Sequence, residues 1–338
     1  MKHRPSVRDV AALAGTSTAV VSYVLNNGPR PVSDDARRRV EAAIETLGYR
    51  PNRLARGLRT KRTSTIGLVI PDLARPFFAQ LAAAIEDAAL QRNQHLFISA
   101  TRFSPDRELS QLQALLDPPV DGVILAPTHW HTRPVAVLAS AEVLYVITHH
   151  HSDDITTVVV DDRLAGLEAT MHLLEHGHQH IACLTGPIVG SPIQARTAGF
   201  REAFAAASHP VEEDLIVSCG YEQLANSAYL ATRDLLERRP DVTAICTTTD
   251  EHGLGVVRAA HDAGREIGTQ LALITIDGTV QSGYLTPPMT VVRAPFAALG
   301  TATVDQLLRQ INGDAPVPVK PLPGSFIRRR SCGCPASV

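Results

Sequence analysis

Histidines and cysteines, the residue types that most often bind transition metals, occur in clusters whose spacing does not favour a metal site. His149–His151 are consecutive. Neighbouring side chains on an extended strand point to opposite faces, so the three rings cannot share one ion. A second group alternates further along the chain: His176, His178 and His180. Cys332 and Cys334 form a pair near the end of the sequence without the second pair that a four-cysteine zinc site needs. We therefore expect no bound metal and no cofactor.

The residue patterns of common catalytic sites are also absent from the sequence. It contains no Gly-x-Ser-x-Gly nucleophile turn, no phosphate-binding loop of the P-loop type and no His-Glu-x-x-His zinc motif. Asp161 and Asp162 are adjacent carboxylates, but their side chains diverge if they lie on a strand. They do not make the facing pair that acid–base chemistry requires. We therefore expect that the protein is not an enzyme.

The stretch with a recognisable chemical purpose is residues 7–23, which read as two short helices joined by a tight turn. Ser6 and Asp9 have the spacing of a capping box at the start of the first helix. Gly15 follows, and glycine tolerates the positive φ that such a turn requires. Ser17 can cap a second helix that runs through Asn26. This layout is that of a helix-turn-helix, whose second helix enters the DNA major groove. It also fits a helical hairpin in an all-α domain, and the stretch alone does not decide between the two.

The distribution of charge favours nucleic acid. The whole chain has a net charge of −2, but residues 1–62 carry 13 Lys and Arg against 5 Asp and Glu, a net charge of +8. The remaining residues have a net charge of −10. A compact basic segment on an acidic body is the electrostatic pattern of a nucleic-acid-binding module attached to another domain.

A third helix and a basic linker complete the N-terminal segment. Ser33 is the expected N-cap of the third helix, and Gly48 is its expected C-terminal stop. Apolar residues at helical spacing should give the three helices their core: Val7, Val10, Leu13, Val20, Val21, Val24, Val40, Ile44 and Leu47. From 51 to 62 the sequence is basic, and a helix of one or two turns there would not be stable by itself in water. We expect this linker to fold only against a partner.

The remaining bulk properties fit a multidomain protein inside the cell. A chain of 338 residues is long for one core, so two or three domains are expected. No apolar run reaches the ~20 residues of a membrane span, and the first residues lack the apolar core of a signal peptide. We expect a cytoplasmic protein without a membrane partner. Five scattered cysteines fit reduced thiols rather than a disulfide framework.

From residue 65 onward, short apolar strands alternate with helices, which predicts a doubly wound α/β body. The expected strands are 65–70, 95–99, 122–126, 143–148, 157–161, 181–185, 216–219, 244–248, 271–276 and 290–292. The expected helices are 76–92, 106–116, 133–139, 163–176, 195–207, 225–238, 251–263 and 295–311. Such strands are almost continuously apolar because helices cover both faces of the sheet. About ten strands suit two lobes better than one, and ligands of such sheets bind beyond the carboxyl ends of the strands.

The N-terminal motifs carry a family resemblance. Val7-Arg-Asp-Val-Ala-x-x-Ala-Gly-x-Ser, Val-Ser-x-Val-Leu-Asn26, Gly48-Tyr-Arg-Pro-Asn and Ile66-Gly-Leu-Val-Ile-Pro-Asp resemble the lactose/galactose-repressor (LacI/GalR) family of bacterial transcriptional regulators. The resemblance covers nearly the whole chain. It implies a helix-turn-helix headpiece at 1–50, a hinge helix at 51–62 and an effector-binding, dimerising body at 63–338. The body should resemble periplasmic sugar-binding proteins, with lobe 1 at about 63–161 and 291–321 and lobe 2 at about 162–290 and 322–338.

The resemblance also implies a mechanism on DNA. A homodimer would place each second helix in the major groove of a half-site of double-stranded operator DNA, and the paired hinge helices would enter the minor groove. Leu58 matches the family's intercalating leucine, and an apolar wedge of this kind bends the duplex. Thr18, Ala19 and Tyr23 match the positions that contact base edges. The further contacts implied are Ser6, Ser17, Ser22, Asn26, Arg30, Tyr49, Asn52 and Ala55. His178 would be structural, because Gly177-His178 matches a helix stop of the family.

The effector is expected between the two lobes. The positions that match the family's cleft contacts are Phe77, Phe78, Asp161, Arg196, Tyr221, Asp250 and Asp277. Carboxylates accept hydrogen bonds from vicinal hydroxyls, arginine donates several, and aromatic rings pack on the apolar face of a sugar. Arg196 can equally be an inter-lobe ion pair, and Asp161 and Asp250 can equally be caps at strand ends. Effector binding would change DNA affinity by a coupling free energy of ~1–3 kcal/mol, in a direction that the sequence does not give.

The chain departs from the family pattern at several cleft positions. Thr148 stands where many members have an aspartate, Thr249 where asparagine is common and Ala294 where glutamine is common. A sugar is therefore the favoured effector, but its identity is open. Two alternatives remain at this point, a periplasmic-type binding protein without a DNA role and a metal-responsive regulator. The chain ends without a leucine-heptad tail, which favours a dimer over a tetramer.

Overall fold

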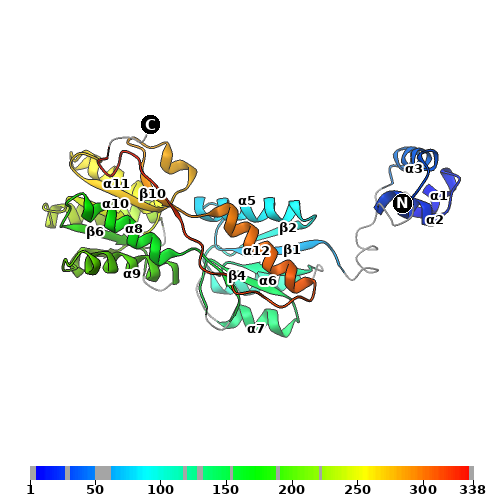
Figure 1. The fold of residues 1–338 in the computed structure, drawn as a ribbon, viewed down its shortest axis with the longest axis horizontal. Helices are drawn as coiled ribbons and strands as arrows, with labels where there is room; N and C mark the ends of the chain where they lie inside the picture. Colours follow the sequence, from blue (N-terminus) through cyan, green and yellow to red (C-terminus); the bar gives the residue numbers. More distant parts are fainter. Residues whose placement is uncertain are drawn as a thin grey trace. The chain divides into compact units, whose positions relative to one another are not determined.

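A computed structural model describes residues 5–26, 31–49, 62–116, 120–127, 132–152, 155–187, 191–220 and 223–334 (Figure 1). The chain divides into two compact units, an N-terminal unit up to Thr63 and a body that begins at Ser64. None of the helices in the described residues is long and apolar enough to cross a membrane.

The N-terminal unit is a three-helix bundle whose helix ends are fixed as the sequence predicts. Its helices are α1 (Val7–Leu13), α2 (Thr18–Asn26) and α3 (Asp34–Leu47). The capping box is present: the backbone N–H of Ser6 donates to the Asp9 carboxylate over 2.7 Å, and the Asp9 N–H donates to the Ser6 hydroxyl over 3.4 Å. Gly48 ends α3 with φ 59°, the left-handed conformation that glycine adopts without strain.

The core of this bundle is small and differs in part from the expected stripes. Val10, Val21 and Val40 are fully buried, together with Ala11, Ala14, Val24 and Ala43. Leu13, which we expected to be buried, is 54% exposed. α1 instead contributes Val10, Ala11 and Ala14 to the core. The small alanine side chains let α1 pack closely against the other two helices.

The first lobe of the body is built on a five-stranded parallel sheet of order β2-β1-β3-β4-β5. Its strands are β1 (Thr65–Ile70), β2 (His95–Ala100), β3 (Gly122–Leu125), β4 (Tyr145–Thr148) and β5 (Thr157–Val158). Its helices are α5 (Pro76–Gln91), α6 (Pro105–Leu116), α7 (Thr132–Ser140) and α12 (Phe296–Ile311). Helices α5 and α12 cover one face of the sheet, and α6 and α7 cover the other.

The second lobe is a six-stranded sheet of order β11-β10-β9-β8-β6-β7, parallel except for β11. Its strands are β6 (Ile181–Thr185), β7 (Ile216–Ser218), β8 (Ala244–Thr247), β9 (Ala272–Asp277), β10 (Thr290–Arg293) and β11 (Ser325–Ile327). Helices α8 (Asp162–Glu175) and α9 (Ser191–Ala206) cover one face, and α10 (Leu224–Arg238) and α11 (Asp250–Asp262) cover the other. Two short 3-10 helices, η1 (Glu213–Leu215) and η2 (Val280–Gly283), lie in connections.

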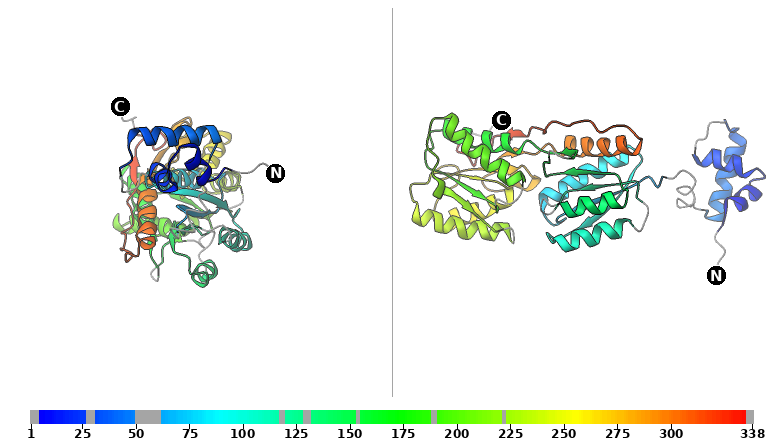
Figure 2. Two further views of the ribbon diagram at one scale, coloured as in Figure 1. Left: turned by 90° about the vertical axis from the view of Figure 1, so that its right-hand side faces the viewer. Right: turned by 90° about the horizontal axis from the view of Figure 1, so that it is seen from below.

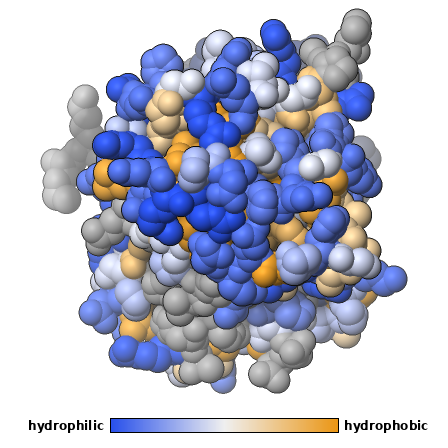
Figure 3. Space-filling model, turned by 90° about the vertical axis from the view of Figure 1, so that its left-hand side faces the viewer, coloured by the Kyte–Doolittle hydropathy of each residue, from blue (hydrophilic) through white to orange (hydrophobic). Residues whose placement is uncertain are grey.

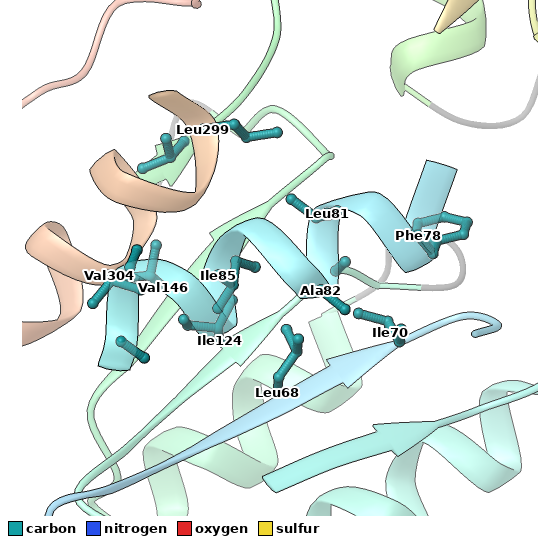
Figure 4. Close-up of a cluster of buried hydrophobic side chains, with 14 of the residues drawn as sticks. Leu68, Ile70, Phe78, Leu81, Ala82, Ile85, Ile124, Val146, Leu299 and Val304 are labelled. Carbon is teal, nitrogen blue, oxygen red and sulfur yellow. The ribbon is translucent and has the colours of Figure 1, made fainter. Parts of the chain in front are cut away.

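The core of the first lobe is formed where α5 and α12 meet the sheet (Figure 4). Alternate residues of β1, among them Leu68 and Ile70, point toward Leu81, Ala82 and Ile85 of α5. Val146 of β4 and Leu299 and Val304 of α12 extend the same cluster. This core holds the start of α5 against the carboxyl ends of the strands, and it therefore fixes Phe77 and Phe78 at that end of the sheet.

The chain crosses between the lobes three times, and one crossing differs from the predicted boundary. We expected lobe 1 to resume at about residue 291. Instead, β10 pairs with β9 through Arg293, so this strand belongs wholly to the second sheet and the crossing follows it. The reason is that Val291 and Val292 are buried in the cores on the two faces of the second sheet. The first and third crossings run together, because Val160 and Leu322 form a parallel bridge.

Both sheets have helices on both faces, so each lobe has the expected doubly wound form (Figures 1 and 2). The outer face of the second lobe is covered mostly by hydrophilic side chains, with hydrophobic residues scattered among them (Figure 3). Such scatter is ordinary for a protein surface.

Candidate effector cleft and DNA-reading helix

A cleft lies between the two lobes of the body, at the carboxyl ends of their strands. Residues just after β1, β3, β4 and β8 line it, together with the last residue of β9. The cleft contains about 680 Å³ of empty space, including the part that opens to solvent. The lining residues are Pro71, Arg75, Phe77, Phe78, Phe103, Pro127, His149, His150, Pro192, Ile193, Arg196, Leu224, Thr249, Glu251 and Asp277. This position is the one at which open α/β sheets bind ligands.

Arg196 of α9 is the central charged group of the cleft. Its Nε donates to Asp162 over 2.7 Å, and its Nη1 donates to Asp277 over 2.8 Å and to the carbonyl of Thr248. The Arg196 side chain is 3% exposed, and both carboxylates are 7% exposed. All three partners lie in the second lobe, so Arg196 is not an ion pair between the lobes. The network holds the guanidinium at the wall of the cleft.

The acidic partners of Arg196 have raised pKa values. Burial raises the pKa of Asp277 to about 7, although the positive charge of Arg196 acts in the opposite direction. Burial also raises the pKa of Asp162, again against the effect of Arg196. Asp277 has a φ of 122°, a conformation that costs a non-glycine residue free energy. Strained backbone and shifted pKa values are concentrated at binding sites, so both features mark Asp277 as a functional candidate.

Aromatic rings of the first lobe form one wall of the cleft. The ring centroids of Phe77 and Phe78 are 5.3 Å apart, and His149 packs against both at 5.1 and 5.2 Å. Phe103 extends the wall at 6.1 Å from Phe78. Desolvation by burial, followed by the effects of the neighbouring His150 and Arg196, lowers the pKa of His149 well below its ordinary value. The His149 ring is therefore neutral at pH 7, and it serves as an aromatic surface with one donor and one acceptor.

One ion pair joins the two lobes across the cleft. Arg75, at the start of α5, places its Nη1 3.4 Å from a carboxylate oxygen of Glu251 in the first turn of α11. The Arg75 guanidinium also lies 5.1 Å from the centre of the Phe103 ring. The side chains of Arg75 and Glu251 are 15% and 26% exposed, so water reaches both groups. The pair can therefore break or exchange partners when a ligand enters or the lobes move.

Two of the predicted cleft residues have internal partners and do not line the cleft. Asp161 caps α8 by accepting from the Leu164 N–H over 3.0 Å. The buried carboxylate of Asp250 accepts from the hydroxyl of Thr275 and from the N–H and hydroxyl of Thr279. It thereby fixes the loop that follows β9. Phe77, Phe78, Arg196 and Asp277 do line the cleft, whereas Tyr221 lies outside the described residues.

Sequence reasoning missed Arg75, Phe103 and Glu251, and it gave His149 no binding role. Glu251 follows Asp250 at the start of a helix, where an acidic residue also has an ordinary role beside the positive helix end. The signal that could have found it is its place just beyond β8. The unusual cleft positions have internal roles too: the Thr148 hydroxyl donates to the carbonyl of Val158, and Thr249 caps α11.

In the N-terminal unit, the start of α2 is exposed to solvent. Thr18 and Ala19 are exposed, and Ser22 and Tyr23 are half-buried. Ser17 accepts from the Val20 N–H over 3.3 Å and so caps this helix. Ser6 is exposed at the start of α1. Tyr49 is different: it is 8% exposed and packs with the helical core. The side chain of Asn26 is not described, and Arg30, Asn52, Ala55 and Leu58 lie outside the described residues.

Comparisons with known proteins match both units. Residues 6–52 match the family "Bacterial regulatory proteins, lacI family", and residues 63–320 match "Periplasmic binding proteins and sugar binding domain of LacI family". Catabolite control protein A of Priestia megaterium is 33% identical over 311 residues, which cover 91% of this chain and 92% of that protein. The transcriptional regulator CelR of Thermobifida fusca is 34% identical over 328 residues, with 94% and 95% of the two chains covered.

Solved structures are similar over the same length. A transcriptional regulator CelR–cellobiose complex superposes with a TM-score of 0.74 at 31% identity, covering 97% of this chain and all of that one. A lac repressor dimer bound to operator and the anti-inducer ONPF superposes with a TM-score of 0.85 at 28% identity, covering 98% and 99%. The chain therefore belongs to the LacI family, and it is a DNA-binding transcriptional regulator and not an enzyme.

Proposed function

We propose that the protein is a repressor that binds operator DNA as a homodimer and is controlled by a small sugar in the cleft between the lobes. The observation that carries the effector part of this proposal is the composition of the cleft, where a buried guanidinium and a carboxylate lie beside a wall of aromatic rings. We place the protein in the cytoplasm in this proposal, because its DNA lies there.

The chemistry of the cleft suits a ligand with several hydroxyl groups and an apolar face. Arg196 donates and the carboxylates of Asp277 and Glu251 accept, so vicinal hydroxyls can bridge them. Phe77 and Phe78 offer apolar area to the carbon face of a sugar ring. The relatives support this assignment, because one similar structure is a complex with cellobiose and another relative, from Escherichia coli, is a ribose operon repressor.

We propose that α2 is the helix that reads DNA. The contacts we assign to it and its surroundings are Ser6, Ser17, Thr18, Ala19, Ser22, Tyr23 and Asn26. The roles of Arg30, Asn52, Ala55 and Leu58 remain predictions from the sequence. We leave Tyr49 out of this set because its ring is part of the helical core. Residues 51–62 are proposed to act as the hinge between a headpiece at 1–50 and the body.

The first lobe carries a surface that suits the proposed dimer. Leu90 near the end of α5 is 64% exposed, and Phe97 and Ile98 of β2 are 49% and 39% exposed. β2 is one of the two edge strands of its sheet. Large apolar side chains on an edge strand favour association, so natural proteins usually cover them. A second copy of this chain is the proposed cover, in line with the similar lac repressor dimer. Phe97→Ser should therefore shift the full chain from dimer to monomer in sedimentation velocity.

The effector assignment can be tested on the full chain. Operator fragments selected in vitro would be titrated with protein by fluorescence anisotropy, with and without a panel of mono- and disaccharides. We expect one of these sugars to change DNA affinity by about 5- to 150-fold, the usual range of allosteric coupling. The same sugar should bind at least about tenfold more weakly to Glu251→Gln, because a hydrogen bond to a charged group is lost. Glu237→Gln, on the exposed side of α10, is the matched control.

The outcomes separate the two parts of the proposal. If the panel leaves DNA affinity unchanged while sugar phosphates or nucleobases alter it, the sugar assignment is wrong. If no selected fragment binds, or if the logarithm of affinity does not fall with the logarithm of salt concentration, the DNA assignment is wrong.

Substitution of an exposed residue tests the reading helix. Ala19→Gln adds a side chain that can pair with adenine in the major groove, so the preferred operator should change at one base pair in each half-site. Ala42→Gln makes the same change at an exposed position of α3 and should leave the preference unaltered. An unchanged preference in Ala19→Gln would contradict the assignment of α2.

A further inference from the structure

The C-terminal end of α8 and the last described residues of the chain meet in space, although about 160 residues separate them in sequence. His172 lies in the last turn of α8, and His176 is its C-cap. The Sγ atom of Cys334 lies 3.4 Å from Nε2 of His172 and 2.8 Å from Nε2 of His176. One donor atom from each of these three residues falls within 4.8 Å of the others. From this juxtaposition we propose that His172, His176, Cys334 and the neighbouring Cys332 form a zinc site.

The spacing of the donors is close to that of a tetrahedral zinc centre. With Zn–S near 2.3 Å and Zn–N near 2.1 Å, tetrahedral angles place sulfur and nitrogen about 3.6 Å apart. The His172–Cys334 distance of 3.4 Å already fits this value, and the His176–Cys334 distance of 2.8 Å must open by under ~1 Å. His176 is exposed, so its ring can move that far without disturbing the core.

The histidines are held in the orientation that zinc binding needs. Residues four apart on a helix share one face, and the two rings are 4.3 Å apart. Nδ1 of His176 lies 2.9 Å from the backbone carbonyl of His172. A carbonyl oxygen only accepts, so Nδ1 carries the proton and Nε2 presents its lone pair toward Cys334. Metal-binding histidines commonly use their second nitrogen in this way. The His172 ring is also fixed from the side, 4.8 Å from Phe326 of β11.

Cys332, two residues before Cys334, is the proposed fourth donor, although its Sγ is not among the three donor atoms that already lie together. Cys332 is 1% exposed, and its thiol donates to the carbonyl of Arg329 over 3.5 Å, a contact that zinc binding would replace. The Thr290 hydroxyl donates to its Sγ over 3.1 Å, which is the outer-shell contact that a thiolate ligand takes. Two thiolates with two imidazoles form one of the usual ligand sets for structural zinc. The remaining cysteines, Cys183, Cys219 and Cys246, lie within or directly after β6, β7 and β8 and are not part of the cluster.

The zinc site is distinct from the effector cleft. Asp162, which binds Arg196 at the cleft, is the first residue of α8, and His172 lies ten positions further on. A rise of 1.5 Å per residue separates them by about 15 Å along the helix. The two sites therefore share an element but no ligand. Bound zinc would fasten the chain after β11 to α8 at the end remote from the cleft.

Metal titration of the reduced full-length protein tests this proposal. After chelation under reducing conditions, we expect one zinc ion per chain to bind in competition with a chromophoric chelator. Cobalt should give visible d–d bands and a near-ultraviolet thiolate-to-metal band. His176→Gln and Cys334→Ser should each weaken zinc binding by at least about tenfold, a loss that removal of even an outer-shell partner can cause. His176 is exposed, so its variant is expected to fold even if Cys334→Ser does not.

Two control variants make the result specific. His261→Gln changes an exposed histidine of α11, and Cys219→Ala removes a thiol outside the cluster. Both should bind zinc like the unmodified protein. The proposal is overturned if the reduced protein binds no zinc, if the cobalt spectrum lacks the thiolate band, or if His176→Gln binds as tightly as the controls. Mass spectrometry of the reduced protein gives a further test. A mass lower by two hydrogens would show a Cys332–Cys334 disulfide in place of free thiols, and this result would overturn the proposal as well.

Discussion

Replacement of Arg196 by glutamine should destabilise the body strongly, and more so at high pH. The Arg196 side chain is 3% exposed and binds the carboxylates of Asp162 and Asp277, which are also buried. Removing one partner from a buried ion pair typically costs about 3–5 kcal/mol, because the remaining charges lose their compensation. A surface pair contributes far less, about 0–1 kcal/mol. For a body of this size the loss corresponds to a fall of the melting temperature on the order of 10 °C.

The pH dependence follows from the direction of the pKa shifts. Burial already raises the pKa of Asp277 to about 7, above its unfolded value, and it also raises that of Asp162. Without the positive charge of Arg196, both pKa values rise further. A raised folded-state pKa gives stability that is fully present below the unfolded pKa and is lost as pH increases through the folded pKa. Between pH 5.5 and 8.5 the variant should therefore lose up to about 1.4 kcal/mol per pH unit for each carboxyl group that stays protonated in the fold.

Urea unfolding of the full chain at pH 5.5, 7 and 8.5 would measure this effect. Arg201→Gln is the matched control, because Arg201 lies on the same helix and binds Glu213 through two hydrogen bonds at an exposed position. It should cost about 0–1 kcal/mol with little dependence on pH. If Arg196→Gln matched Arg201→Gln, or if its deficit were the same at all three pH values, Arg196 would not be holding two buried carboxylates.

Three further perturbations test other features of the body. Burial lowers the pKa of His252 to about 3, and neither of its ring nitrogens has a hydrogen-bond partner within the described part of the chain. Protonation of His252 therefore favours the unfolded state, and lowering the pH from 7.5 to 5 should reduce the free energy of unfolding by about 2 kcal/mol through this residue. Thermal unfolding of His252→Leu should show a correspondingly weaker pH dependence. A double-mutant cycle with Arg75→Gln and Glu251→Gln should give a coupling of about 1 kcal/mol in unfolding free energy, whereas strictly additive losses would show that the pair does not join the lobes. Gly166→Ala would place a methyl group 2.0 Å from the carbonyl oxygen of Arg196 and should cost at least about 1–3 kcal/mol. Gly220→Ala should change chemical denaturation little, because no atom of the described residues, apart from its chain neighbours, would lie within 4 Å of the added methyl group.

The sequence predicted the elements well because their signals are local. β1 and β6 have the predicted bounds, Ser6 and Asp9 form the expected capping box, and Ser33 caps its helix as expected. Apolar runs of four to six residues and capping spacings depend only on near neighbours in the chain. β11 was missed for the same reason: it is three residues long, is not fully buried, and exists because β10 lies beside it.

The cleft was predicted less completely because its contacts are long-range. The family pattern pointed to Arg196 and Asp277, but it could not show that Asp162 completes their network. Arg75 and Glu251 are 176 residues apart, and nothing in either local sequence indicates the other. Asp250 illustrates a related ambiguity, because a carboxylate after a strand fits both a ligand contact and an internal bond. Only the positions of Thr275 and Thr279 distinguish the two.

The cluster at the end of α8 shows what a spacing rule omits. The sequence rule for a four-cysteine zinc site requires a second pair of cysteines, and the sequence has none beside Cys332 and Cys334. Zinc requires only four suitable donors at bonding distance, and two histidines one helical turn apart meet that requirement equally well. The fold brings them together because β11 pairs with β10 and carries the following residues along α8. Since the sheet has already ordered that segment, zinc would bind donors that are largely in place, unlike the ligands of a small zinc finger, which the metal itself must organise.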